Sequence, residues 1–521
     1  MHGLTTMQLL KYSSQLRNGG GQQLIDHYSI ALRWLNELGL QSAADTAVQY
    51  LSGGELKRLQ VAIELTALKM PNLVCFDEIT SGLDSNSTEM VVRALKRLTT
   101  FHPLTIFCTI HQPTSEVLTI FDSVYALAKR GVAIFFGPSE SIQQHLGTVP
   151  ELVHSSPFPI ETLIKQSCLS CKDSCITKLL VEITDQQFKI TKYNDEIADQ
   201  TTLAPDGVQS NRPRFMVHSV LTLSRRFASY TVAYLWTEWL FFFVSSLIFA
   251  TSLRLLFSDQ VATENGCLNL EDDHSACSEK TPKQLAKKLM LIDNLYYNYF
   301  YAILFQLFIL INTSLSFSRE YELFKSEHRN GVYSSGSWYL VKSISELVPL
   351  FPIILLYMYI LDIFEAVTEH IFYWHAVLLL TLSAVSTASV GHIINLLVGS
   401  SSLIVQTVVL VAVYLIYNLI GNFIIPVVEM HYFWQLMANF SITRFFFESL
   451  MLLQYGFGRC QEGQIQAILY SMSIDETHYL PNIGMLLFNL ILFRLVALYL
   501  LVRKTNSISN RQNCAKRIVD Y

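Results

Sequence analysis

The chain has 521 residues, of which 51% are apolar and only 15% charged, and its 37 basic and 42 acidic residues give a formal net charge of −5. This composition excludes a disordered chain, and the length argues against a single soluble domain. The near-neutral charge argues against nucleic acid as the main partner, since a phosphate backbone needs a basic surface, and the apolar excess points to a membrane for part of the chain.

Residues 51–55, Leu-Ser-Gly-Gly-Glu, open a predicted helix, because apolar residues recur at helical spacing from Leu56 to Leu65. The two glycines after Ser52 leave backbone N–H groups open at the start of this helix, a geometry that suits a phosphate. Taken alone, such a pattern is more often a turn with an N-cap.

A short apolar run over residues 73–76 predicts a buried strand, and it ends in Asp77 and Glu78. Burying an unpaired carboxylate costs free energy, so two carboxylates at the end of a buried strand need an explanation. A nucleotide site would explain both of them. Asp77 can hold Mg²⁺ through water, and Glu78 can orient or deprotonate the attacking water.

The turn at residues 81–84, Ser-Gly-Leu-Asp, follows, and a second predicted strand over residues 105–110 ends in His111. A histidine at a strand end beside a triphosphate can contact the γ-phosphate. Read one at a time, these motifs are a strand cap, a turn and a core histidine. The presence of all four in this order favours a nucleotide site.

From Trp236 onward, apolar segments are long enough to cross a hydrocarbon core of ~30 Å, which takes about 20 helical residues. We expect six spans, at 235–257, 295–317, 344–364, 372–398, 402–426 and 482–502. The basic loop 318–343 and the basic tail predict that the polar N-terminal half and both termini lie in the cytosol, although the lysines of loop 258–294 conflict with this orientation. Residues 214–226 are predicted to form an amphipathic connecting helix at the inner membrane surface.

These motifs resemble the signature (51–55), Walker B (73–78), D-loop (81–84) and switch histidine (His111) of an ATP-binding-cassette ATPase. The longer stretches LSGGELKRLQVAIEL and FDEITSGLDS, with EHRNGVY and SELVP in the apolar half, resemble ABC transporter subfamily G, the White/Scarlet/Brown type half-transporters. One departure is Ile79, where that family usually has proline.

The resemblance implies an α/β P-loop-type ABC ATPase domain, incomplete here, followed by an all-α transmembrane domain of six helices. We expect a partial nucleotide-binding domain at 1–150, a linker and connecting region at 151–215, and the transmembrane domain at 216–521. The implied cofactors are ATP and Mg²⁺. The implied site residues are catalytic Glu78 and His111, magnesium-binding Asp77, and nucleotide-binding Ser52, Gly53, Gly54, Glu55 and Asp84.

The Walker A pattern GxxxxGK[ST] does not occur in these 521 residues. Nothing in them therefore cradles the β- and γ-phosphates, and we expect this chain alone not to hydrolyse ATP. We interpret the chain as beginning inside the cassette, either as part of a longer sequence or as a short isoform, and favour the first. A complete partner could still form one site from its own Walker A and the signature and Asp84 of this chain.

By resemblance, a second half-transporter subunit completes a homo- or heterodimer around a cavity for a small hydrophobic or amphipathic cargo, such as a lipid, sterol, pigment precursor or xenobiotic. The membrane is the plasma membrane or an intracellular one. Polar side chains are costly when they face lipid, so we expect those within the second and fifth spans to point inward. Our candidates for the pathway are Phe308, Asn312, Tyr414 and Asn418. The alternative is a non-catalytic membrane subunit or truncated isoform that lends its signature motif to a complete partner.

Overall fold

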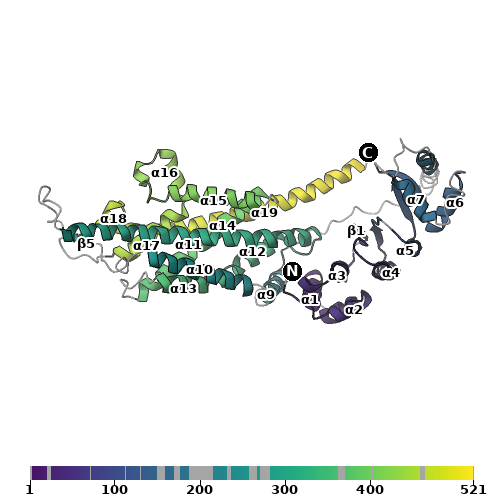
Figure 1. The fold of residues 1–521 in the computed structure, drawn as a ribbon, viewed down its shortest axis with the longest axis horizontal. Helices are drawn as coiled ribbons and strands as arrows, with labels where there is room; N and C mark the ends of the chain where they lie inside the picture. Colours follow the sequence, from purple (N-terminus) through teal and green to yellow (C-terminus); the bar gives the residue numbers. More distant parts are fainter. Residues whose placement is uncertain are drawn as a thin grey trace. The chain divides into compact units, whose positions relative to one another are not determined.

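The computed structural model describes residues 3–19, 25–70, 72–111, 113–128, 131–149, 159–168, 176–186, 215–230, 236–256, 267–269, 282–361, 370–399, 403–457 and 464–519. The chain divides into two compact units, Met1–Arg212 and Pro213–Tyr521 (Figure 1).

In the first unit, short strands alternate with helices. The helices are α1 (Thr6–Asn18), α2 (His27–Glu37), α3 (Gly53–Leu65), α4 (Ser85–Phe101), α5 (Ser115–Leu118), α6 (Ile142–Gly147) and α7 (Pro159–Ser167), with 3-10 turns at Gln41–Ala43, Val48–Tyr50 and Ser139–Ser141. The strands are β1 (Leu73–Phe76), β2 (Thr105–Cys108), β3 (Val124–Ala128) and β4 (Val132–Gly137).

Strands β1 and β2 pair in parallel, with Leu73 opposite Thr105 and Phe76 opposite Cys108. One face of this pair packs, through residues such as Phe76 and Ile106, on an apolar core built from α1 to α4. The other face is open, because Leu73 is 53% exposed and Phe107 is 62% exposed. The strand predicted over residues 73–76 is therefore confirmed, but its predicted burial is wrong for this face, and β2 ends at Cys108 rather than at residue 110.

Strands β3 and β4 form an antiparallel hairpin that packs with α6 and α7 around a second, smaller core. His145 of α6 is buried beneath this hairpin, where its Nε2 lies 2.9 Å from the backbone oxygen of Ile134. Its Nδ1 has no hydrogen-bond partner in the described part of the chain. Burial lowers the pKa of His145, because a charged ring would be poorly solvated there.

The second unit is a bundle of long helices (Figure 1). They are α9 (Val217–Tyr230), α10 (Trp236–Leu256), α11 (Pro282–Arg329), α12 (Ser335–Ser345), α13 (Leu347–Leu361), α14 (His370–Val398), α15 (Leu403–Leu419), α16 (Tyr432–Ala438), α17 (Ile442–Tyr455), α18 (Ala467–Ser471) and α19 (Tyr479–Val519). Short turns at Val427–Glu429 and Glu476–His478 and a small antiparallel pair, β5 (Cys267–Asn269) with β6 (Gln464–Gln466), complete it.

Each of the six apolar segments expected from the sequence falls on a helix, in order α10, α11, α13, α14, α15 and α19. Within the described residues, four helices are long and apolar enough to cross a membrane: Ile292–Arg329, Ser335–Tyr359, Tyr373–Val398 and Glu476–Asn506. A fifth crossing is possible if α16 and α17, bent by 70° at their junction, count as one span. The count of six therefore remains a prediction. Helix α11 is also longer than expected, since it continues from Pro282 to Arg329.

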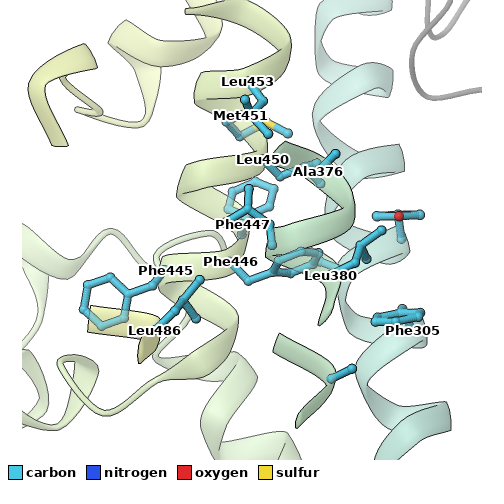
Figure 2. Packing of buried hydrophobic residues seen from close by; sticks show 14 of the residues in the cluster. Phe305, Ala376, Leu380, Phe445, Phe446, Phe447, Leu450, Met451, Leu453 and Leu486 are labelled. Atoms are coloured by element: carbon cyan, nitrogen blue, oxygen red, sulfur yellow. The ribbon is translucent and has the colours of Figure 1, made fainter. Parts of the chain in front are cut away.

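The core of the bundle is dense in aromatic and aliphatic side chains from α11, α14, α17 and α19 (Figure 2). Phe446 and Phe447 of α17 are fully buried, and Phe305 of α11 and Leu380 of α14 pack into the same cluster. Because lipid tails are as apolar as these side chains, the cluster stabilises a bundle in a bilayer through close packing rather than through removal from water. Helix α17 is thus held inside the bundle on nearly all sides, although it also carries polar residues such as Glu448.

The connecting segment expected at residues 214–226 forms helix α9, which begins at Val217 and carries a buried arginine. Arg226 is 6% exposed and pairs with Glu327 of α11, with Nη1 and Oε1 2.9 Å apart. The Tyr333 hydroxyl donates a short hydrogen bond to the same carboxylate. These contacts fasten α9 to the end of α11.

Candidate functional site

The carboxyl ends of β1 and β2 bring two predicted residues, Asp77 and Glu78, together with a threonine. The Thr109 hydroxyl donates to Oδ1 of Asp77 at 2.7 Å and accepts from the backbone N–H of Glu78 at 2.8 Å. The parallel register explains this, because it sets Thr109 beside the end of β1, where its own N–H reaches the oxygen of Phe76 at 3.0 Å. Thr109 was not among the predicted residues, and only the register could have indicated it.

Glu78 and His111, both predicted as catalytic, face one another. Nε2 of His111 lies 2.8 Å from Oε1 of Glu78, and their side chains are 77% and 49% exposed. Glu78 has a φ of +50°, a left-handed conformation that is uncommon for a residue other than glycine. Its backbone oxygen accepts from Nζ of Lys57 at 3.1 Å and from the N–H of Ser81 at 3.2 Å. The start of α3 is thereby linked to the end of β1.

The predicted signature residues form the N-terminus of α3 as a capping box. The N–H of Glu55 donates to the Ser52 hydroxyl at 3.3 Å, and both the N–H and the hydroxyl of Ser52 donate to the Glu55 carboxylate, at 2.9 and 2.8 Å. These hydrogen bonds, led by the one from the Ser52 backbone, lower the pKa of Glu55. The pattern serine–glutamate at this spacing is the usual start signal of a helix.

The two glycines of the signature differ in their surroundings. A Cβ added at Gly53 would meet nothing within 4 Å, whereas one at Gly54 would touch Leu83 at 3.6 Å. Gly53 therefore faces open space at the helix N-terminus, and Gly54 packs on the turn that contains Gly82 and Asp84. Asp84 caps α4 by accepting from the N–H of Ser87, and hydrogen bonds from Ser87 lower the pKa of Asp84.

The structure thus gathers the predicted residues into two neighbouring groups of one unit. One group is the strand-end cluster of Asp77, Glu78, Thr109 and His111, and the other is the start of α3 with the Asp84 turn. Oδ2 of Asp77 has no partner in the described residues, so this carboxylate can hold a hydrated Mg²⁺. The open space beside Gly53 at the N-terminus of α3 can receive an anion.

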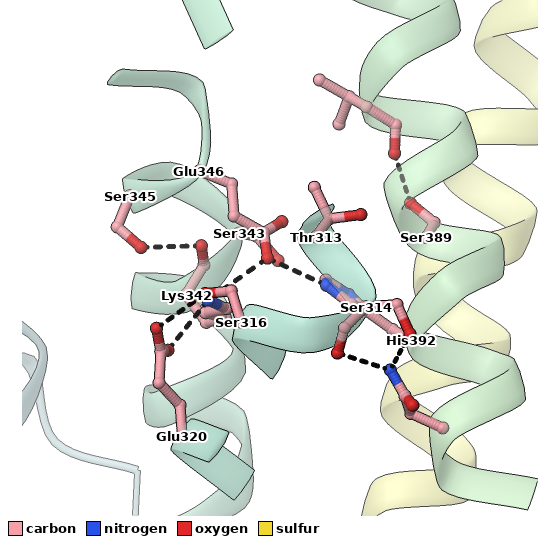
Figure 3. Close-up of polar contacts among 12 residues, drawn as sticks. Thr313, Ser314, Ser316, Glu320, Lys342, Ser343, Ser345, Glu346, Ser389 and His392 are labelled. Carbon is pink, nitrogen blue, oxygen red and sulfur yellow. Dashed lines mark hydrogen bonds and ion pairs between the residues drawn. The ribbon is translucent and has the colours of Figure 1, made fainter. Parts of the chain in front are cut away.

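The helical unit holds a buried network of charges that was not predicted (Figure 3). Nζ of Lys342 lies 2.9 Å from Oε2 of Glu320 and 3.5 Å from Oε1 of Glu346. Glu346 also receives Nε2 of His392 at 2.9 Å and Nη2 of Arg494 at 3.2 Å. The network joins α11, α12, α14 and α19.

The four pathway candidates do not share one cavity. Phe308 and Asn312 of α11 line a cavity beside Lys342. Tyr414 of α15 lines a separate, smaller cavity, with its hydroxyl donating a short hydrogen bond to the backbone of Ile303. Asn418 is 4% exposed and donates to the backbone oxygen of Tyr414 at 2.8 Å. A transport role for these residues stays a prediction.

Comparison with protein families matches residues 235–455 to the ABC-2 type transporter model. ABC transporter G family member 13 of Arabidopsis thaliana is 30% identical over 37% of this chain and 29% of its own length. Member 11 of the same plant is 36% identical over 26% of this chain and 19% of its own length. Member 1 of Petunia hybrida is 25% identical over 66% of this chain and 52% of its own length.

The chain thus spans at most about half the length of these curated relatives. The similarity to the Petunia hybrida protein reaches into both units, because no single unit accounts for 66% of the chain. The matched membrane model covers α10 through α17.

Proposed function

Because this chain is related to the ABC transporter G family and carries an ABC-2 type transporter domain, we propose that it is a half-transporter. It couples ATP hydrolysis in a two-subunit assembly to the movement of a hydrophobic or amphipathic small molecule across a membrane. The observation that carries this proposal is the occurrence, in one chain, of an exposed Asp77–Glu78–His111 cluster and a bundle of apolar spanning helices.

The proposed roles of the first-unit residues are those that the sequence resemblance implies. Asp77 holds Mg²⁺ through water, Glu78 positions the attacking water, and His111, 2.8 Å from Glu78, contacts the γ-phosphate. The start of α3 at Ser52, Gly53 and Gly54 receives the triphosphate bound by the facing subunit, with Glu55 and Asp84 holding that surface in shape.

The absence of GxxxxGK[ST] from the 521 residues favours a second candidate function. In that case the chain is a non-catalytic subunit, and its signature completes the ATP site of a partner that supplies the phosphate loop. The reading frame upstream of Met1 separates the two candidates. An in-frame phosphate loop there supports the first, and a stop codon supports the second.

The biochemical test measures ATP hydrolysis by the purified 521-residue chain in lipid vesicles, alone and together with a subunit that carries an intact phosphate loop. We expect no hydrolysis by the chain alone. In the mixed assembly, Gly53→Glu should reduce hydrolysis at least tenfold, because a carboxylate would occupy the open space at the start of α3. Gly147→Glu is the matched control, since a Cβ at Gly147 also meets nothing within 4 Å and lies on another helix, α6.

Hydrolysis by the chain alone that Glu78→Gln removes would contradict the dependence on a partner. A mixed assembly in which Gly53→Glu and Gly147→Glu behave alike would contradict the role of α3. A cargo-uptake assay on the same vesicles, with lipid, sterol and xenobiotic probes, then tests transport separately from hydrolysis.

A further inference from the structure

Helix α19 carries an exposed apolar stripe along one face of the bundle. Ile491, Leu495, Tyr499 and Val502 follow one another at steps of three or four residues, so they lie on the same side of the helix, and they are 38–62% exposed. The segment from Glu476 to Asn506 is long and apolar enough to cross a membrane. In a bilayer this stripe therefore faces the acyl chains of lipids.

The stripe ends in two consecutive cations. Arg503 is exposed and makes no hydrogen bond or ion pair within the described part of the chain, so all five of its N–H donors are open. Nζ of Lys504 donates to the backbone oxygen of Leu396, in the last turn of α14, at 2.9 Å. A lysine has three N–H donors, and this hydrogen bond uses one of them. Donors for an anion thus remain on both side chains.

Positive charge is in excess at this end of the helix. Nζ of Lys504 lies 5.6 Å from the centre of the Tyr321 ring of α11, and Lys325 follows one turn later on the same face of α11. Lys325 pairs with Glu322 at 3.7 Å, and Glu322 is the one acidic side chain that contacts any of these cations among the described residues. Three cations, with Arg503, thus meet a single carboxylate.

Tyr499 indicates the depth at which the cations lie in a membrane. Tyrosine is enriched at the level of the lipid headgroups, because its ring is apolar and its hydroxyl is polar. Tyr499 is 62% exposed, and Arg503 follows it by one helical turn on the same side of α19. The apolar stripe and the cations are therefore continuous, with hydrocarbon contact before Tyr499 and a phosphate-level charge after it.

We propose that this end of α19 binds one anionic phospholipid. Its phosphate accepts hydrogen bonds from Arg503 and Lys504, and one acyl chain lies along the stripe past Tyr499. A free phosphate would use the cations alone, whereas a lipid uses the cations and the stripe together. The proposal goes beyond the proposed transport, because none of these residues lines the cavity that contains Phe308 and Asn312 and the binding needs neither nucleotide nor cargo.

The test uses the full chain in phosphatidylcholine nanodiscs without nucleotide. The probe is phosphatidylglycerol with a diazirine in mid-chain, compared with phosphatidylcholine that carries the same diazirine. We expect the phosphatidylglycerol probe to label the peptide that spans Ile491 to Tyr499 in a saturable way and at least fivefold more strongly than the phosphatidylcholine probe. Unlabelled phosphatidylglycerol should displace it, and an excess of soluble glycerol phosphate should not.

Arg503→Gln should weaken labelling by the phosphatidylglycerol probe about fivefold, the contribution of one cation at an anionic membrane surface. The double variant Arg503→Gln with Lys504→Gln should weaken it further, and Arg503→Lys, which keeps the charge, should retain most of it. The matched control is Arg97→Gln on α4 of the first unit, an exposed arginine whose replacement changes the net charge equally, and it should leave labelling unchanged.

Equal labelling of this peptide by the two probes would overturn the proposal, and so would equal effects of Arg503→Gln and Arg97→Gln. Displacement of the probe by glycerol phosphate would overturn the assignment to a lipid, because the headgroup alone would then suffice. The comparison of probes on the unaltered chain decides the matter even if a variant fails to fold. Since no nucleotide is present, a failure here leaves the proposed transport intact, and a loss of ATP-driven uptake leaves the binding result intact.

Discussion

The candidate carboxylates of the first unit face water, whereas those of the helical unit face other charges. Glu78 and His111 are 49% and 77% exposed and form a single pair. Glu346 is 8% exposed and contacts Lys342, His392 and Arg494. An exposed pair of this kind contributes about 0–1 kcal/mol and can rearrange around a ligand. A buried network is difficult to open, because removing one member leaves the others uncompensated.

The strongest way to test this contrast is to remove the centre of the network. Glu346→Leu should lower the free energy of unfolding by about 3–5 kcal/mol, because Arg494, His392 and Lys342 lose their shared carboxylate. Unfolding of the full chain by SDS in mixed micelles, followed by tryptophan fluorescence, measures it. Glu322→Leu, at an exposed position, is the control, and an equal loss in both variants would contradict the network.

A smaller effect is expected at the capping box of α3. Ser52→Ala should destabilise α3 by about 1 kcal/mol, since it removes the acceptor for the N–H of Glu55 and the donor to the Glu55 carboxylate. Hydrogen exchange of the α3 amides in the full chain measures this change. Ser115→Ala, in α5, supplies a comparison outside the box, and unchanged exchange in α3 of Ser52→Ala would rule the contribution out.

The change in stability of the first unit with pH should be smaller than the effect at the capping box and confined to the β3–β4 hairpin. The folded pKa of His145 is lowered by burial, so the unfolded chain binds a proton first as the pH falls below about 6.5. The stabilisation that comes from burying neutral His145 is therefore complete above about pH 6.5. It declines as the pH falls from there toward the lower pKa of His145 in the folded state. Hydrogen exchange of residues 132–146 should accelerate at pH 5.5 beyond the intrinsic rate, and His145→Gln should abolish this excess.

The smallest stability effect should come from the candidate catalytic glutamate. Glu78→Gln should change the free energy of unfolding by less than about 0.5 kcal/mol, because its pair with His111 is exposed. Hydrogen exchange around β1 measures it. A loss above 1 kcal/mol would make Glu78 a structural residue and remove the contrast between the two units.

The residues of the candidate site could be predicted from the sequence because they are close in the chain or follow strand ends. The sequence did not indicate Thr109, whose role depends on the register of β1 and β2. Nor did it indicate the charged network, whose members come from four helices and lie up to 174 positions apart, from Glu320 to Arg494. Within this network, only the ion pair of Lys342 and Glu346 could have been predicted from the sequence, because the two residues are four positions apart. The ion pair of Arg226 with Glu327 was not predicted either, because the two residues are 101 positions apart.

The open side of β1 and β2 has a practical consequence for handling the protein. Leu73 and Phe107 present apolar surface to solvent on a parallel sheet, a kind of sheet that normally has both faces covered. Contiguous apolar surface of this kind favours self-association, so the chain reconstituted in detergent micelles should still show concentration-dependent clustering through this side. A protein that covers this side should return the preparation to a monodisperse form.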